Sequence, residues 1–172
     1  MTEQPSATPT VSWQSPPEPT GPAPGVQWAG HGERLVAYIV DGFILTLVFL
    51  ALSVVLVGGL LLSYRPGEGV GAGAVSGALL WVLVVFGVSN AYFPFFWARG
   101  GQTPGMRVFG IRVVRDRDGG PVTTWIAIVR LLGYRISGLV FYVGYVWILF
   151  DARRRGWHDL IAGTVVIKDP VR

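Results

Sequence analysis

Two long stretches of apolar residues dominate the pattern of the chain. The first, Leu35 to Ser63, contains a single charged residue, Asp41, and the second, Ala72 to Ala98, contains none. An α-helix needs about 20 residues to cross the hydrocarbon core of a bilayer, and both stretches exceed that length. The pattern therefore predicts two transmembrane helices, joined by a short loop over 64–71.

The second stretch carries two local signals. Gly73 and Gly77 form a small-xxx-small pair, which permits two helices to approach closely. The aromatic run Tyr92 to Trp97 suits the headgroup boundary of a membrane. Pro94, within that run, predicts a kink or the end of the helix.

A third apolar stretch, Val122 to Phe150, contains Arg130 and Arg135. An arginine at the centre of a bilayer costs at least about 2.5 kcal/mol, so we expect the first half to form an amphipathic helix at the interface. The remainder is short for a full crossing. We expect the stretch to re-enter the membrane and return, with a bend near 137–138. A single tilted third helix is the alternative.

Two short runs rich in β-branched residues predict a pair of strands. One lies within 108–113, between predicted turns at 102–105 and 118–120, and the other is 164–168. They can pair only if both lie on the same side of the membrane. The expected fold class is therefore an all-α membrane protein with two transmembrane helices, a third helical or re-entrant segment, and a small cytoplasmic β-hairpin or strand pair.

The chain before the first helix is polar and holds seven of the twelve prolines. It shows no hydrophobic periodicity, which predicts disorder. It also lacks the basic segment and apolar core of a secretory signal peptide. The expected organisation is a disordered proline-rich tail over 1–30, a membrane domain over 31–168 and a C-terminal tail over 169–172.

Composition agrees with a membrane location. Hydrophobic residues make up 51% of the chain, charged residues 14%, and mean hydropathy is +0.50. An average soluble domain has about 25% charged residues. The absence of cysteine excludes disulfides, thiolate metal sites and cysteine nucleophiles. The net charge of +4 fits cytoplasmic loops better than nucleic-acid binding, so no nucleic-acid partner is expected.

Basic residues gather on both sides of the third apolar stretch. If that stretch crossed the membrane once, the two groups would lie on opposite sides, which the positive-inside tendency disfavours. A re-entrant path would place both groups, and both termini, in the cytoplasm. The two groups are Arg99, Arg107, Arg112, Arg115 and Arg117, and Arg153, Arg154, Arg155, Lys168 and Arg172.

Three charged residues stand in distinctive sequence contexts. Arg34 opens the first helix, Asp41 follows within it, and Asp159 lies in the segment Arg-Gly-Trp-His-Asp-Leu-Ile-Ala-Gly-Thr. Between them, residues 101–107 read Gly-Gln-Thr-Pro-Gly-Met-Arg, and residues 110–114 read Gly-Ile-Arg-Val-Val.

In their order and spacing, these segments resemble the RDD family of membrane proteins, which is named for one arginine and two aspartates. The resemblance covers roughly residues 30–168, with Met106 where the family usually has lysine. It implies that Arg34, Asp41 and Asp159 are the motif residues. It further implies a suggested part in transport of small solutes or ions, with cation/proton exchange among the suggestions.

The motif charges allow two interpretations. Arg34 and Asp41 are separated by about 10 Å along one helix, so direct contact is not expected, but Arg34 could reach Asp159 if the C-terminal segment folds back. Asp41 is either a proton or cation site, or a packing residue bonded to Arg130, Arg135 or a hydroxyl. The structural interpretation is slightly preferred.

The remaining candidates have plainer interpretations. Arg130 and Arg135 are the possible charge partners, although we favour extension of both side chains to lipid phosphates. The run Arg153, Arg154 and Arg155 is expected to anchor the chain to anionic lipid. The two histidines, at positions 31 and 158, lack partners at ligand spacing, so no metal site is expected.

Two classes of function follow. One is a multi-pass protein of the plasma membrane that moves an ion or small solute, alone or as a homo-oligomer. The other is a non-catalytic scaffold or accessory subunit that assembles with other membrane proteins. No catalytic set and no cofactor motif is recognised, so an enzyme is not expected.

Overall fold

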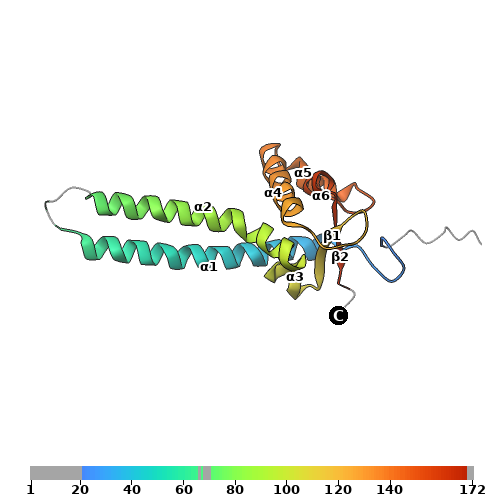
Figure 1. Cartoon of the computed structure of the whole chain (residues 1–172), viewed down its shortest axis with the longest axis horizontal. Helices are drawn as coiled ribbons and strands as arrows, with labels where there is room; N and C mark the ends of the chain where they lie inside the picture. The colour runs from blue at the N-terminus through green and yellow to red at the C-terminus, as the bar shows by residue number, and fades with distance from the viewer. Residues whose placement is uncertain (1–20, 66, 68–70, 170–172) are drawn as a thin grey trace, which may run out of the picture.

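The computed structural model describes residues 21–65, 67 and 71–169. The disorder expected for residues 1–20, part of the predicted loop and the last residues of the C-terminal tail lie outside this range. Two long helices, α1 (His31–Ser63) and α2 (Ala72–Gly100), form an antiparallel hairpin that extends to one side of the molecule (Figure 1). The remaining elements gather at the other end, and we call residues 101–169 the cap.

The hairpin confirms the two predicted spans as helices. Both are long and apolar enough to cross a membrane, and their most apolar windows are not buried by the rest of the protein. α2 continues through Pro94 to Gly100. It is capped by Gly101, which adopts a left-handed conformation (φ 70°) and donates its N–H to the carbonyl of Trp97 at 2.9 Å.

The turn predicted over 102–105 is wrong in part, because a short helix, α3 (Pro104–Val108), begins there. The Thr103 hydroxyl caps it by accepting the N–H of Met106 at 3.2 Å, and Pro104 occupies its first turn, where a missing N–H costs nothing. Val108, expected in a strand, therefore lies in this helix.

The predicted strand pair is confirmed. β1 (Ile111–Arg115) and β2 (Thr164–Lys168) pair antiparallel, with Val113 opposite Val166. The end of the proline-rich tail joins them: the N–H of Ala29 donates to the carbonyl of Val166 at 3.0 Å, and Trp28 forms a bridge with Ile167. The part of the tail nearest to α1 is thus ordered by hydrogen bonds to β2, contrary to the expected disorder up to residue 30.

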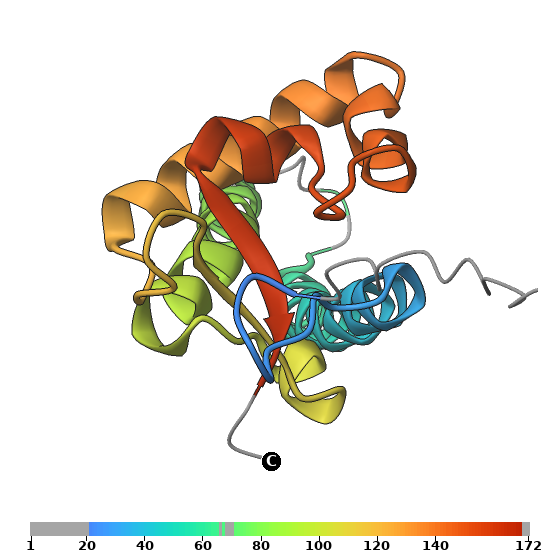
Figure 2. The same cartoon turned by 90° about the vertical axis from the view of Figure 1, so that its right-hand side faces the viewer.

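The third apolar stretch forms two helical arms. α4 (Thr124–Leu139) runs across the hairpin rather than along it (Figures 1 and 2), and α5 (Val143–Val146) continues into a short 3-10 helix, η1 (Trp147–Leu149). The arms are bent by 114° relative to each other. The bend follows residues 137–138, at Phe141 and Tyr142, whose φ angles are 49° and 62°.

The two ends of this stretch lie together. Arg155, after η1, bonds Asp116, before α4, at 3.0 Å. The stretch therefore leaves and returns at the same end of the molecule, as a re-entrant path requires and a single straight crossing does not allow. This contact also brings Arg155, from the second basic group, to Asp116, which lies between Arg115 and Arg117 of the first.

The last helix, α6 (Trp157–Ala162), packs on α4 and leads directly into β2. A buried core lies where the sheet, α2 and α3 meet; it includes Trp97, Met106, Ile111, Val113 and Val166. Most large apolar side chains of the hairpin, in contrast, are exposed.

Candidate functional site

Asp159 is the centre of a buried polar cluster in the cap. It sits in the first turn of α6, where its carboxylate accepts the N–H of Gly156 at 3.2 Å and so caps its own helix. Gly133 of α4 allows the two helices to come close, because a Cβ there would lie 2.6 Å from the Cα of His158. The approach brings the α4 side chains to Asp159.

Two arginines share the Asp159 carboxylate. Arg34, from the first turn of α1, donates to Oδ2 at 3.0 Å and also to the carbonyl of Val166 at 3.2 Å. Arg130, from α4, donates to Oδ1 and to the hydroxyl of Thr164. The Thr164 hydroxyl in turn donates to Oδ1 at 3.2 Å. The expected reach of Arg34 to Asp159 is confirmed.

Arg130 does not extend to lipid in this structure, contrary to the interpretation favoured from the sequence. Its side chain is 1% exposed, and its guanidinium lies over the rings of Trp97 and Tyr134, at 4.9 Å and 5.8 Å from their centres. It also does not contact Asp41. The aromatic faces and Asp159 together compensate the burial of its charge.

The charges around Asp159 determine its protonation. Burial raises the pKa of Asp159, but Arg130, then His158 and Arg34, outweigh burial and hold that pKa well below its ordinary value. Burial also lowers the pKa of His158, which stacks on Tyr134 with 3.8 Å between ring centres. Where His158 is neutral, the guanidinium groups of Arg130 and Arg34 still keep Asp159 ionised.

The buried His158 predicts a pH-dependent stability. Because its folded pKa lies below the ordinary value of about 6.5, the unfolded chain binds the proton more readily. Stability should therefore be highest above about pH 6.5 and fall on acidification toward the folded pKa. Thermal unfolding in detergent micelles between pH 7.5 and 5 should show this fall, and His158→Asn should flatten it. An equal slope in both proteins, which share His31, would remove His158 as the cause.

Asp41 forms a second, separate cluster where α1, α2 and α3 meet. Its side chain is 1% exposed. It accepts the hydroxyl of Tyr92 at 2.9 Å, the hydroxyl of Thr103 and the backbone N–H of Gly105 at 2.8 Å. The predicted hydroxyl partners are therefore present, and neither of the two proposed arginines contacts this carboxylate.

The segment before β1 packs closely against Asp41 because it contains glycine at position 105. A Cβ at Gly105 would lie 2.2 Å from the carbonyl oxygen of Ala37 and 2.9 Å from Asp41 Oδ2. Only glycine lets α3 pack this closely on α1. Nothing local in the sequence marks Tyr92, Thr103 or Gly105 as partners of Asp41, although Thr followed by Pro is a known start signal for a helix.

The other candidate arginines lie apart from both clusters. Arg135 donates to the amide oxygen of Asn90 on α2 at 3.0 Å. Arg153 and Arg155 bond Asp116, and Arg155 also bonds Asp151 at 3.0 Å. Contact of this basic run with lipid stays a prediction, and two of its three charges already have carboxylate partners.

Among the described residues, no group of three or more His, Asp or Glu side chains is arranged to hold a metal ion. His31 lies at the start of α1, where its Nε2 is 2.9 Å from the carbonyl oxygen of Ile148. This contact joins η1 to the hairpin.

The Asp159 cluster joins Arg34, near the start of the chain, to Asp159, near its end. The match to known proteins covers the same part of the chain. The sequence profile described as the RDD family matches residues 28–163. The chain belongs to the RDD family. This RDD protein is similar to the uncharacterized protein YxaI of Bacillus subtilis, with 30% identity over 147 residues that cover 81% of this chain and 96% of YxaI.

Two shorter matches are proteins of Mycobacterium tuberculosis, strains CDC 1551 / Oshkosh and H37Rv, each named proline-rich antigen homolog. Each is 29% identical over 89 residues, which cover 51% of the RDD protein described here but only 37% of the relative. No solved structure matches. In this RDD protein, then, the motif arginine and second aspartate form one cluster, while the first aspartate belongs to another.

Proposed function

We propose that this RDD protein is a non-catalytic membrane assembly module, in which the motif charges attach the cap to the hairpin and the hairpin itself associates with a second copy. The observation that carries this proposal is the distribution of charge. Arg34, Asp41 and Asp159 all have their partners within one copy, and beyond Asp41 neither α1 nor α2 contains a charged residue before Arg99.

Helix lengths support a location of the Asp41 cluster at the membrane boundary. About 20 helical residues span about 30 Å of hydrocarbon. Counted from the loop end of the hairpin, that layer reaches about Phe43 in α1 and about Ala91 in α2. Asp41 and its partner Tyr92 lie just beyond it. The layer itself then contains no ionisable group that could carry an ion across.

A groove between the loop-side halves of α1 and α2 supports association. It has a volume of about 870 Å³ and is lined on one side by Gly59 and on the other by Gly73 and Gly77. Small residues permit close helix packing in lipid. The indole N–H of Trp81, also in this lining, is buried with no hydrogen-bond partner in the described part of the chain. A helix of a second copy could supply one.

Cysteine cross-linking in native membranes tests this proposal, because the chain has no native cysteine. Val55→Cys places a thiol in the groove, and Leu83→Cys places one at a similarly exposed position outside it. We expect a disulfide-linked dimer with the first variant under mild oxidation and little or none with the second. Equal cross-linking of both, or none at Val55, would contradict association through the groove.

A second candidate, cation or proton transport, is favoured by one observation. Within the described residues, the Asp41 carboxylate accepts only uncharged donors and has no cationic partner. A flux assay in proteoliposomes distinguishes the two functions. Transport requires a protein-dependent cation or proton flux that Asp41→Asn abolishes without loss of folding, whereas the assembly module should give no flux above empty liposomes.

The distribution of basic residues indicates where the protein is located and how it is oriented. We propose a multi-pass protein of the plasma membrane with both termini in the cytoplasm. The support is the ion pair of Arg155 with Asp116, which brings the segments on both sides of the bent stretch together, so that the positive-inside tendency applies to one end of the molecule. The loop end of the hairpin has Arg65 as its one basic residue.

A further inference from the structure

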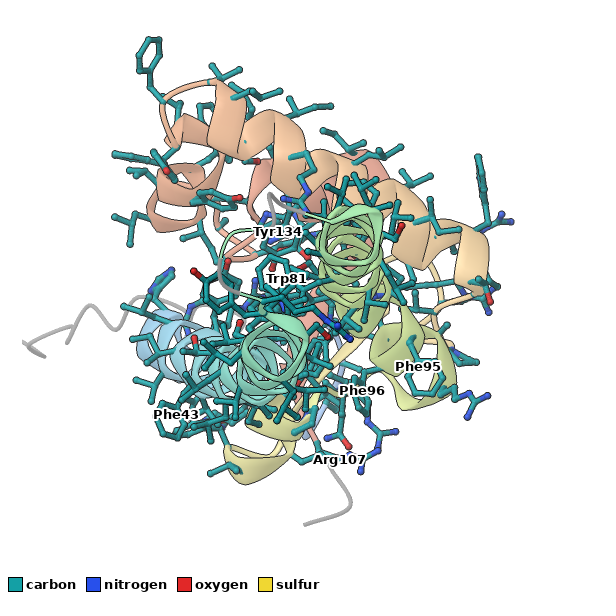
Figure 3. All side chains as sticks on the ribbon, turned by 90° about the vertical axis from the view of Figure 1, so that its left-hand side faces the viewer. Phe43, Trp81, Phe95, Phe96, Arg107 and Tyr134 are labelled. Atoms are coloured by element: carbon teal, nitrogen blue, oxygen red, sulfur yellow. The ribbon has the colours of Figure 1, made fainter. Side chains whose placement is uncertain are left out.

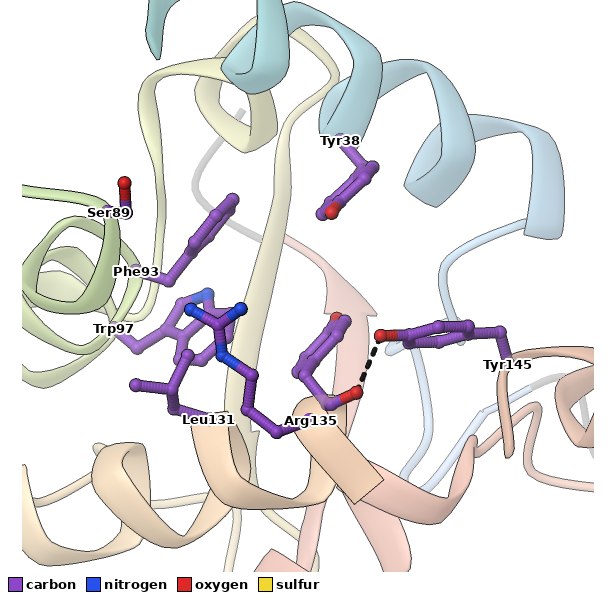
Figure 4. A pocket seen from close by; sticks show the side chains of 8 residues that line it. Tyr38, Ser89, Phe93, Trp97, Leu131, Arg135 and Tyr145 are labelled. Carbon is purple, nitrogen blue, oxygen red and sulfur yellow. Dashed lines mark hydrogen bonds between the residues drawn. The ribbon is translucent and has the colours of Figure 1, made fainter. Parts of the chain in front are cut away.

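A small pocket lies under α4, where α1, α2 and α5 meet. It has a volume of about 100 Å³, well above the roughly 10–15 Å³ that one water molecule needs. Its lining is largely aromatic and includes Tyr38, Phe93, Trp97, Tyr134 and Tyr145; Figure 4 shows the pocket from close by. Seen along the hairpin from its loop end, Tyr134 lies next to the two long helices (Figure 3).

The lining of this pocket contains hydrogen-bond donors. Arg135 is the single charged residue of its lining, and its guanidinium points into the space (Figure 4). The indole N–H of Trp97 is buried without a hydrogen-bond partner in the described part of the chain, and the side chain is almost fully buried. Tyr38, on the facing wall, has a hydroxyl for which the described residues provide no hydrogen bond.

Arg135 differs from the two arginines of the Asp159 cluster. Its one hydrogen bond is to the neutral amide of Asn90, and it has no carboxylate partner among the described residues. A cation next to hydrocarbon needs a counter-charge. A guanidinium, an indole N–H and a phenol can together donate to a tetrahedral oxyanion.

We propose that this pocket binds the phosphate of an anionic phospholipid. The inference rests on insertion of the hairpin in lipid, not on association of two copies. Asn90, which holds Arg135, lies about 27 Å along α2 from its loop end, close to the hydrocarbon boundary where lipid phosphates are found. The bent stretch also exposes apolar side chains that suit contact with acyl chains, among them Leu132, Leu139 and Val146.

Lipid-dependent thermal stability of the purified full chain in detergent tests the proposal. We expect dioleoyl phosphatidylglycerol to raise the unfolding temperature of the wild type, with apparent affinity reduced at least about tenfold in Arg135→Gln. Arg117→Gln removes an exposed arginine outside the pocket and should behave as wild type. Tyr38→Phe removes only a hydroxyl and should weaken the effect several-fold, which gives a second readout if Arg135→Gln folds poorly.

Inorganic phosphate, added without lipid, distinguishes the source of the ligand. We expect no stabilisation by phosphate at concentrations where the lipid acts. If phosphate alone stabilises the wild type as strongly as the lipid, and Arg135→Gln abolishes both effects, the site takes free phosphate and the lipid assignment is overturned. An undiminished lipid effect in both Arg135→Gln and Tyr38→Phe would overturn the pocket itself.

Discussion

Replacement of Asp159 by asparagine is expected to destabilise the protein by about 3–5 kcal/mol, the largest effect of any single change considered. The substitution keeps the shape of the side chain but removes the one carboxylate that Arg34 and Arg130 share. Breaking a buried ion pair from one side leaves an uncompensated charge, and here it leaves two. Thermal unfolding in detergent micelles, together with the amount of protein recovered from membranes, should report the loss.

Asp118→Asn is the matched control for this experiment. Asp118 also pairs with an arginine, Arg115 at 3.1 Å, but the side chain is 48% exposed. Exposed ion pairs contribute little, so the change should stay within about 0.5 kcal/mol. Similar unfolding temperatures for the two variants would mean that the Asp159 cluster does not hold the cap in place.

Gly105→Ala is expected to cost about 3 kcal/mol through a different cause. The added methyl group would overlap the carbonyl oxygen of Ala37, a backbone atom of α1 that cannot rotate away. α3 would have to move out, and the hydrogen bonds of Thr103 and Gly105 to Asp41 would be lost with it. The unfolding temperature in detergent is again the measurement.

Gly87→Ala provides the control, because a Cβ at that position of α2 meets nothing within 4 Å. Alanine is the better helix former, so this variant should be neutral or slightly stabilised. If Gly105→Ala also proves neutral, α3 does not pack against Asp41 as described.

The sequence was most informative where a signal is local. Hydrophobic length predicted the hairpin, and the β-branched run predicted β2 with its bounds, Thr164–Lys168. The bend of the third apolar stretch was placed too early, because Ser137 and Gly138 remain helical, with the Ser137 hydroxyl bonded to the carbonyl of Gly133 at 2.8 Å. The backbone turns instead at Phe141 and Tyr142, residue types that rarely adopt positive φ.

Partners distant in sequence were the least predictable part of the site. The family resemblance identified Arg34, Asp41 and Asp159, but not that Arg130 would complete the Asp159 cluster. Spacing along a helix predicts which residues share a face, not what a neighbouring element presents to them. For Arg130, the carboxylate comes from a residue 29 positions later in the chain.

The pairing of residues 27–29 with β2 was missed for a related reason. Composition predicts disorder for a segment that cannot bury apolar surface on its own. Here the surface is supplied by another part of the chain, since Val26 and Trp28 pack on Val114, Val165 and Ile167. Ordering of this short stretch depends on a sheet edge that its own sequence does not reveal.

The placement of the cap on one side of the membrane can be measured directly with single cysteines and an impermeant maleimide. Ser63→Cys, at the loop end of the hairpin, should be labelled from one side only. Arg117→Cys and Ala152→Cys, exposed positions on either side of the bent stretch, should both be labelled only from the other. Labelling of the latter two from opposite sides would mean that residues 122–150 cross the membrane, and the fold described here would be contradicted.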